Sequence, residues 1–121
     1  MSVTFKMQVV TNNFLKIGPD AVRRVAAVIQ ETAEQIEDDA KALVPVDTGA
    51  LQESIEAEKL KQLQWQVTAG GGEVDYAEYV EYGTTRAPSQ PYFNPAVDGA
   101  RQGYREKVGA AVRGAAEENR G

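Results

Sequence analysis

The spacing of hydrophobic residues changes along the chain, and each change predicts a different secondary-structure element. Within residues 1–18 we expect an N-terminal strand and a turn, because positions 2–10 alternate between apolar and polar side chains. Over residues 20–44 apolar residues recur every three or four positions, which predicts a long amphipathic helix. Asp20 is the expected N-cap, and Pro45 ends the pattern because a residue that precedes proline disfavours helical dihedral angles.

The segment that follows predicts a β-hairpin. Residues 55–70 contain two alternating stretches, with a turn expected at 59–62 between them. In the second stretch Leu63, Trp65 and Val67 alternate with polar residues. We therefore expect the apolar face of the hairpin to cover the long helix.

Two further helices are expected towards the C-terminus. Residues 75–83 bring apolar positions to one side of a short helix, and Gly83 is its expected C-cap. The segment 84–93 carries two prolines and is expected to form an exposed loop. An Asn-Pro pair resembles an N-cap followed by proline at the first helical position, and it opens a C-terminal helix over 94–117.

Glycine residues interrupt this last helix, and each lowers its stability by up to about 1 kcal/mol relative to alanine. Either the helix frays in the free monomer, or its glycines permit close approach of another backbone and the helix orders within an assembly. The glycines are Gly99, Gly103, Gly109 and Gly114.

Together these elements predict one α+β domain over residues 1–121. A long amphipathic helix packs on a small antiparallel sheet, and a short helix and a C-terminal helix complete the fold. The 121 residues, 42% of them hydrophobic, are enough for one modest core. The long helix should extend about 35 Å at the usual helical rise, so we expect its ends to reach neighbouring subunits.

Composition narrows the chemistry open to the chain. It has no cysteine and no histidine, which excludes disulfides, thiolate or imidazole metal sites and catalysis by histidine. A net charge of -5 argues against a protein that binds nucleic acid through clustered basic residues. No apolar run approaches the roughly 20 residues that span a bilayer, and the N-terminus lacks the pattern of a secretion signal. We therefore expect an intracellular protein with no cofactor, metal or membrane partner.

The tripeptide Asp47-Thr48-Gly49 allows two interpretations. It is the motif of aspartic proteases, in which two identical chains can each donate one aspartate and the pair activates water. Such proteases are almost entirely β, whereas this tripeptide directly follows a long predicted helix. The favoured alternative is structural: Pro45, Asp47, Thr48 and Gly49 shape the junction between helix and sheet through turn-capping oxygens and a flexible glycine.

A cluster of tyrosines and acidic residues falls in the expected short helix: Tyr76, Glu78, Tyr79, Glu81 and Tyr82. Carboxylates could suggest a metal or sugar site, but the lack of histidine and of any further acidic ligand except Asp75 argues against a dedicated metal site. Amphipathic tyrosines are more typical of interfaces, or of cores that leave the hydroxyl in water. The Gly-rich segment 70–72 lacks the Lys-Ser or Lys-Thr of a phosphate-binding loop.

Three motifs, in order along the chain, resemble those of a known family. They are Val-Pro-Val-Asp-Thr-Gly-Ala-Leu at 44–51 with Ser54-Ile55, Tyr-Ala-Glu-Tyr-Val-Glu-Tyr-Gly-Thr at 76–84, and Pro-Ser-Gln-Pro-Tyr-Phe-Asn-Pro-Ala at 88–96. Over about residues 20–115 the chain resembles the small neck or tail-completion proteins of lambdoid long-tailed bacteriophages (siphophages), also described as head-tail joining or tail-component proteins. The resemblance implies a structural virion subunit that is not an enzyme.

The resemblance also implies where the protein acts and what it contacts. Proteins of this kind form a homo-oligomeric ring, a connector at the head-tail junction through which DNA passes. The expected partners are copies of the chain, an adaptor or stopper of the neck, and the tail terminator or tail tube, with assembly in the host cytoplasm. A tail terminator of the same structural class is one alternative, and a generic intracellular oligomerisation domain is another. The net negative charge suits a lumen through which DNA slides without sticking.

The expected interface residues fall into two groups. One group holds the short helix against the sheet or against a neighbour: Tyr76, Tyr79, Tyr82 and Gly83. The other forms a loop that docks on an adjacent ring: Arg86, Pro88, Pro91, Tyr92 and Phe93. Ordinary packing within the chain is the alternative for every one of them.

Overall fold

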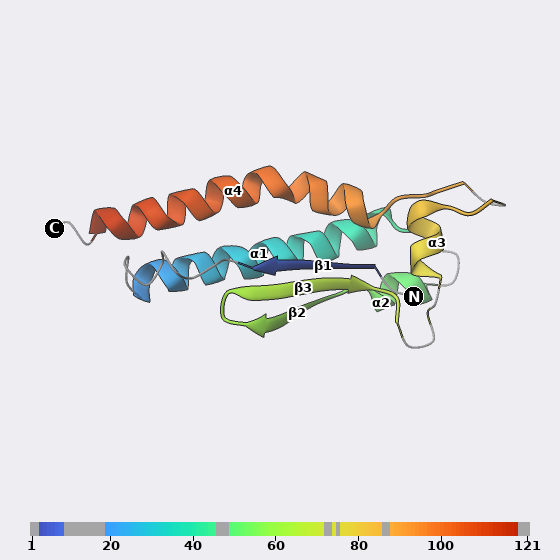
Figure 1. The fold of residues 1–121 in the computed structure, drawn as a ribbon, viewed down its shortest axis with the longest axis horizontal. Coiled ribbons are helices and arrows are strands. Elements are labelled where there is room, and N and C mark those ends of the chain that lie inside the picture. Colours follow the sequence, from blue (N-terminus) through green and yellow to red (C-terminus); the bar gives the residue numbers. More distant parts are fainter. Residues whose placement is uncertain are drawn as a thin grey trace.

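The computed structural model describes residues 3–8, 19–45, 49–71, 74, 76–85 and 88–118. These residues form three strands and four helices. Figure 1 shows an elongated molecule in which helices α1 (Pro19–Leu43) and α4 (Phe93–Glu118) lie side by side along the long axis. A small sheet packs along α1, and α3 (Ala77–Tyr82) lies at one end of the molecule. The α+β fold class predicted from the sequence is confirmed.

Helix α1 forms because its apolar residues follow the helical period, and together with the polar Thr32 they make one buried stripe: Ala21, Val25, Ile29, Thr32, Ala33, Ile36 and Ala40. The helix was expected over 20–44 and begins at Pro19, a residue suited to a first helical turn. Asp20 therefore lies inside this turn, where its carboxylate pairs with Arg23. The prediction of Asp20 as the N-cap is wrong.

The strands β1 (Val3–Gln8), β2 (Glu56–Lys61) and β3 (Gln64–Ala69) form an antiparallel sheet in the order β1-β3-β2. Val67 of the central strand stands opposite Phe5 of β1, and its side chain is fully buried. Alternation along β3 thus turns one face of the sheet towards the core. Residues 2, 9 and 10 of the expected first strand, and the turn expected between it and residue 18, lie outside the described residues.

The hairpin turn comes later than predicted. A turn was expected at 59–62, but β2 continues through Lys59 to Lys61 and the turn occupies residues 62–63. The charged sequence of β2 resembles a loop, yet charged residues are common on edge strands because they discourage pairing with another sheet. An irregularity in the pairing between Lys59 and Lys61 accommodates the end of the strand.

A short helix that was not predicted, α2 (Ala50–Ser54), connects α1 to the sheet. It begins after Gly49, whose φ of 78° is in the left-handed region that favours glycine. Gln52 of α2 donates from Nε2 to the Lys41 carbonyl oxygen at 3.0 Å, which satisfies one of the open carbonyls at the end of α1. The helix has only five residues, too few for a hydrophobic period to be recognised in the sequence.

Helix α4 packs against α1, and an ion pair between Lys107 and Glu31 (3.6 Å) joins the two helices. It begins at Phe93, so the Asn-Pro pair lies within the first turn, and the prediction of Asn94 as the N-cap is wrong. A Cβ atom placed on Gly99 or Gly103 would meet no atom within 4 Å, so packing inside this chain does not require glycine there. Among the described residues, no helix combines the length and apolar character needed to cross a membrane.

Candidate interaction surfaces

A buried carboxylate joins α3 to the start of α4. Glu81 is 2% exposed, and its Oε1 accepts hydrogen bonds from the backbone N–H groups of Tyr92 (3.1 Å) and Phe93 (2.7 Å). Its Oε2 accepts from the backbone N–H of Asn94 at 3.0 Å. N–H groups at a helix start lack acceptors within the helix, and the helix dipole favours negative charge there. These three bonds, which we call the Glu81 cap, offset the cost of burying the carboxylate.

Tyr92 strengthens the same junction. Its hydroxyl donates to the Ala77 carbonyl oxygen at 3.1 Å, and its ring meets that of Phe93 edge to face with centroids 6.4 Å apart. Burial, and then the negative charge of Glu81, raise the pKa of Tyr92 above its ordinary value, so the phenol stays protonated and can donate. The start of α4 is therefore fixed to α3 by side-chain and backbone contacts.

The opposite side of α3 is exposed. Tyr79 and Tyr82 are 47% and 61% exposed, although side chains as large as tyrosine usually bury most of their surface. Gly83 closes the helix as predicted: its N–H donates to the Tyr79 carbonyl oxygen at 2.8 Å and its φ is 79°. The half-buried Glu78 lies one turn before Tyr82. We call Glu78, Tyr79 and Tyr82 the tyrosine face of α3.

The predicted interface residues do not all reach the surface. The exposed ones are Tyr79, Tyr82, Pro88 and Pro91, while Tyr76 and Gly83 are half-buried. Tyr92 and Phe93 are fully buried in their own chain, so the exposed loop expected over 84–93 ends before them. Of the predicted junction, Pro45 and Gly49 are half-buried, whereas Asp47, Thr48 and the predicted interface residue Arg86 lie outside the described residues.

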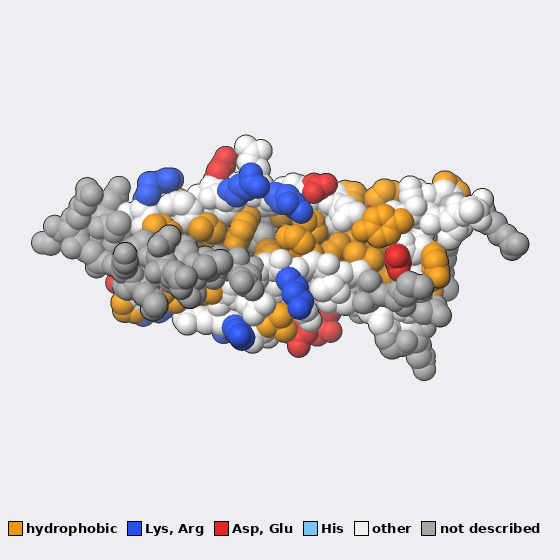
Figure 2. Space-filling model, viewed as in Figure 1, with side chains coloured by type: hydrophobic (Ala, Val, Ile, Leu, Met, Phe, Trp, Pro, Cys, Tyr) orange, Lys and Arg blue, Asp and Glu red, His pale blue; other side chains and the backbone are white. Residues whose placement is uncertain are grey.

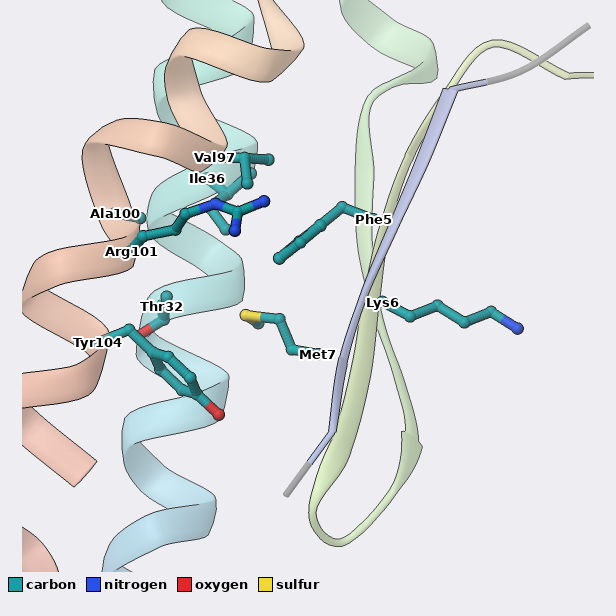
Figure 3. A pocket seen from close by; sticks show the side chains of 9 residues that line it. All are labelled: Phe5, Lys6, Met7, Thr32, Ile36, Val97, Ala100, Arg101 and Tyr104. Atoms are coloured by element: carbon teal, nitrogen blue, oxygen red, sulfur yellow. The ribbon is translucent and has the colours of Figure 1, made fainter. Parts of the chain in front are cut away.

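A groove lies between β1, α1 and α4, with a cavity of about 200 Å³. Figure 3 shows Phe5 and Met7 pointing from β1 towards the two helices, while Lys6 points away on the other side of the strand. The guanidinium of Arg101 lies 5.6 Å from the centre of the Phe5 ring, and its Nε is 3.4 Å from Oδ1 of Asp98. The lining residues are Phe5, Lys6, Met7, Thr32, Ile36, Val97, Ala100, Arg101 and Tyr104. We call this the β1–α4 groove.

The described residues bear on two of the alternatives raised by the sequence, a metal site and an aspartic protease. No group of three or more acidic side chains that could hold a metal ion occurs among them. The aspartic protease hypothesis expects an almost entirely β fold, whereas two long helices dominate this one. Both surfaces have features that are common at protein–protein interfaces. Helix α3 carries exposed aromatic rings, and the groove is apolar with an arginine at its edge.

The family of the protein follows from its sequence match. A family model described as "Bacteriophage HK97-gp10, putative tail-component" matches residues 9–83, which is more than half of the chain. The chain belongs to this HK97-gp10-like family. No curated protein and no solved structure matches it. Membership supports a structural tail component of a bacteriophage, located in the virion and in contact with other virion proteins.

The family match ends before the segment that follows α3, so it leaves out α4 and the third motif of the sequence analysis. The family match therefore covers only one side of the Glu81 cap: the carboxylate of Glu81 lies within the matched residues, and the N–H groups that it accepts from lie beyond them. In the sequence, Glu81 falls within the tyrosine and acid cluster, and nothing in that pattern predicts the cap. Its position four residues after the buried Ala77 could have indicated it, because a carboxylate on the apolar side of a helix needs buried donors.

Proposed function

We propose that the chain is a structural subunit of the phage neck, which forms a homo-oligomeric ring at the head-tail junction and completes the tail. The observation that carries this proposal is the tyrosine face of α3, exposed at one end of the molecule and held in place by the Glu81 cap. Exposed aromatic side chains on a rigid support are typical of protein interfaces. Membership of a family of tail components supports a partner within the virion.

The shape and charge of the molecule also support this role. Helices α1 and α4 run along the long axis (Figure 1), as suits the wall of a ring. The segment 31–39 of α1 carries five acidic residues and no basic one: Glu31, Glu34, Glu37, Asp38 and Asp39. Glu31 and Glu37 pair with Lys107 and Lys41, and a surface that bears the remaining acidic side chains and faces the lumen lets DNA pass without binding.

The proposed partners are further copies of the chain, an adaptor or stopper of the neck, and the tail terminator or tail tube. Assembly takes place in the host cytoplasm and the product is part of the virion. The chain acts there by contact and needs neither a cofactor nor a catalytic residue.

Deletion of the gene, followed by electron microscopy of the particles, tests the proposal. We expect filled heads and separate tails of normal length, and restored joining when the wild-type gene is supplied. Supply of a Tyr79→Ala/Tyr82→Ala variant should restore joining poorly, while Leu60→Ala, at another exposed apolar residue, should restore it fully. Overlong tails would instead indicate a tail terminator. Normal phage from the deletion would contradict any role in the neck.

A further inference from the structure

The β1–α4 groove has the size and lining to hold one aromatic ring. A dry apolar cavity of about 150 Å³ is known to bind benzene, and this one measures about 200 Å³. Phe5 of β1, Ile36 of α1 and Val97 of α4 supply apolar walls from three different elements. Figure 2 shows hydrophobic side chains gathered in a band between α4 and β1, with basic side chains beside it on α4. The groove thus combines an apolar interior with an exposed guanidinium at its edge, that of Arg101, which also pairs with Asp98 of the same helix.

The tyrosine face of α3 has the complementary features. Tyr79 and Tyr82 present two exposed rings. Glu78 lies one turn before Tyr82, so a carboxylate accompanies the rings on the same side of the helix. At the groove, the Arg101 side chain is 56% exposed and stands beside the ring of Phe5. The two surfaces are therefore chemically complementary: one offers aromatic rings and a carboxylate, and the other offers an apolar cavity and a guanidinium.

The two surfaces cannot meet within one chain. The Glu81 cap fixes α3 to the first turn of α4, at Phe93 and Asn94. Arg101 lies about 12 Å further along α4 at the usual helical rise. The exposure of Tyr79 and Tyr82 shows that their own groove does not cover them. A contact between the surfaces must therefore join different copies, and contacts of this head-to-tail type generate closed rings when the rotation between copies closes.

We propose that the β1–α4 groove of each copy receives the tyrosine face of α3 of a second copy, with Tyr82 in the cavity and Glu78 paired with Arg101. This inference rests on the proposed ring and names the contact that builds it. Most of the groove, from Phe5 to Met7 and from Val97 to Tyr104, lies outside the part of the chain that matches the family.

Cross-linking through introduced cysteines tests the contact directly, because the chain contains no cysteine of its own. The double variant Glu78→Cys/Arg101→Cys keeps both tyrosines and is treated with a short bismaleimide at high protein concentration and in purified particles. We expect a ladder of dimers, trimers and larger species. A mixture of the two single variants should stop at the dimer, since each chain then carries one reactive position. Glu58→Cys/Arg101→Cys, with the first cysteine on the exposed strand β2, is the matched control and should give no ladder.

Two further variants separate docking from folding. Ala100 lines the cavity, so the larger side chain of Ala100→Leu in the double-cysteine background extends into the cavity, should leave the melting temperature unchanged or raised, and should abolish the ladder. Without the cysteines, Arg101→Glu and Glu78→Arg should each reduce association by about tenfold or more, because each places like charges opposite one another. Arg101→Glu/Glu78→Arg in one chain should restore association. Restoration of this kind does not occur in a chain that has merely lost its fold.

The outcomes separate this contact from the proposed function. A ladder that persists with Ala100→Leu overturns the inference, as does cross-linking of Arg101→Cys to a different virion protein. Rings or joined particles without the ladder overturn the contact and leave the neck function standing. Absence of the protein from particles overturns the neck function, whatever the cross-linking of the free chain shows.

Discussion

The Glu81 cap makes a quantitative prediction about stability. In Glu81→Ala the backbone N–H groups of Tyr92, Phe93 and Asn94 lose their acceptor, and the first two of these bonds are buried. A buried donor left without an acceptor costs about 1–3 kcal/mol. The two buried donors together should therefore lower the free energy of unfolding by about 2–6 kcal/mol, a large share of the 5–15 kcal/mol that is typical of a folded domain.

A second substitution separates the charge from the shape of the side chain. Glu81→Gln keeps one oxygen acceptor for Tyr92 and Phe93 but turns an amide donor towards the N–H of Asn94. It also removes the negative charge that favours the start of α4. We expect a loss of about 1–3 kcal/mol, intermediate between the wild type and Glu81→Ala. Glu78→Gln, about one turn earlier on the same helix and not part of the Glu81 cap, is the control and should stay within about 0.5 kcal/mol of the wild type.

Urea unfolding measures these differences, with far-UV circular dichroism for the helices and the fluorescence of the single tryptophan, Trp65, for the sheet. Amide hydrogen exchange at Tyr92 and Phe93 should accelerate in Glu81→Ala more than exchange at Ile29 in the middle of α1. If Glu81→Ala unfolds within about 0.5 kcal/mol of the wild type at an unchanged m-value, the cap does not stabilise the protein and the reasoning fails.

Three further predictions concern single residues. Because the pKa of Tyr92 is raised in the folded chain, the contribution of Tyr92 to stability is complete below its ordinary pKa of 10.0 and is lost as the pH rises above that value. Tyr92→Phe should therefore flatten the fall in urea midpoint between pH 9 and 11 (about two units around that pKa), and it should cost about 1 kcal/mol at neutral pH through the lost bond to Ala77. An equal fall in the wild type and in Tyr92→Phe would contradict this prediction. Gly103→Ala should raise the free energy of unfolding by up to about 1 kcal/mol, because a Cβ there meets nothing within 4 Å; a melting temperature below that of the wild type would refute this. Gly49→Ala should instead lower it by about 1 kcal/mol, since φ is 78° at that position, and a urea midpoint equal to that of the wild type would show that the turn relaxes without strain.

The sequence by itself determined the elements whose side chains repeat with a regular period. Helix α1, the central strand around Val67 and the body of α4 follow local patterns, because the face that each element buries is written in its own spacing. The α+β class and the resemblance to phage tail proteins followed from the same local information. The ends of these elements are predicted less accurately. Residue type alone favours Asp20 and Asn94 as caps, whereas the two helices begin one residue earlier, at Pro19 and Phe93.

The tertiary structure decided everything that joins distant parts of the chain. The acceptor at the start of α4 comes from Glu81, on another helix, and no local spacing relates that carboxylate to Phe93. The same holds for the burial of Tyr92 and for the groove, which brings Phe5 near the N-terminus against Arg101 near the C-terminus. Secondary-structure patterns reflect which face of an element is buried, but the partner that buries it is chosen by packing between elements, and such contacts leave no period in the sequence.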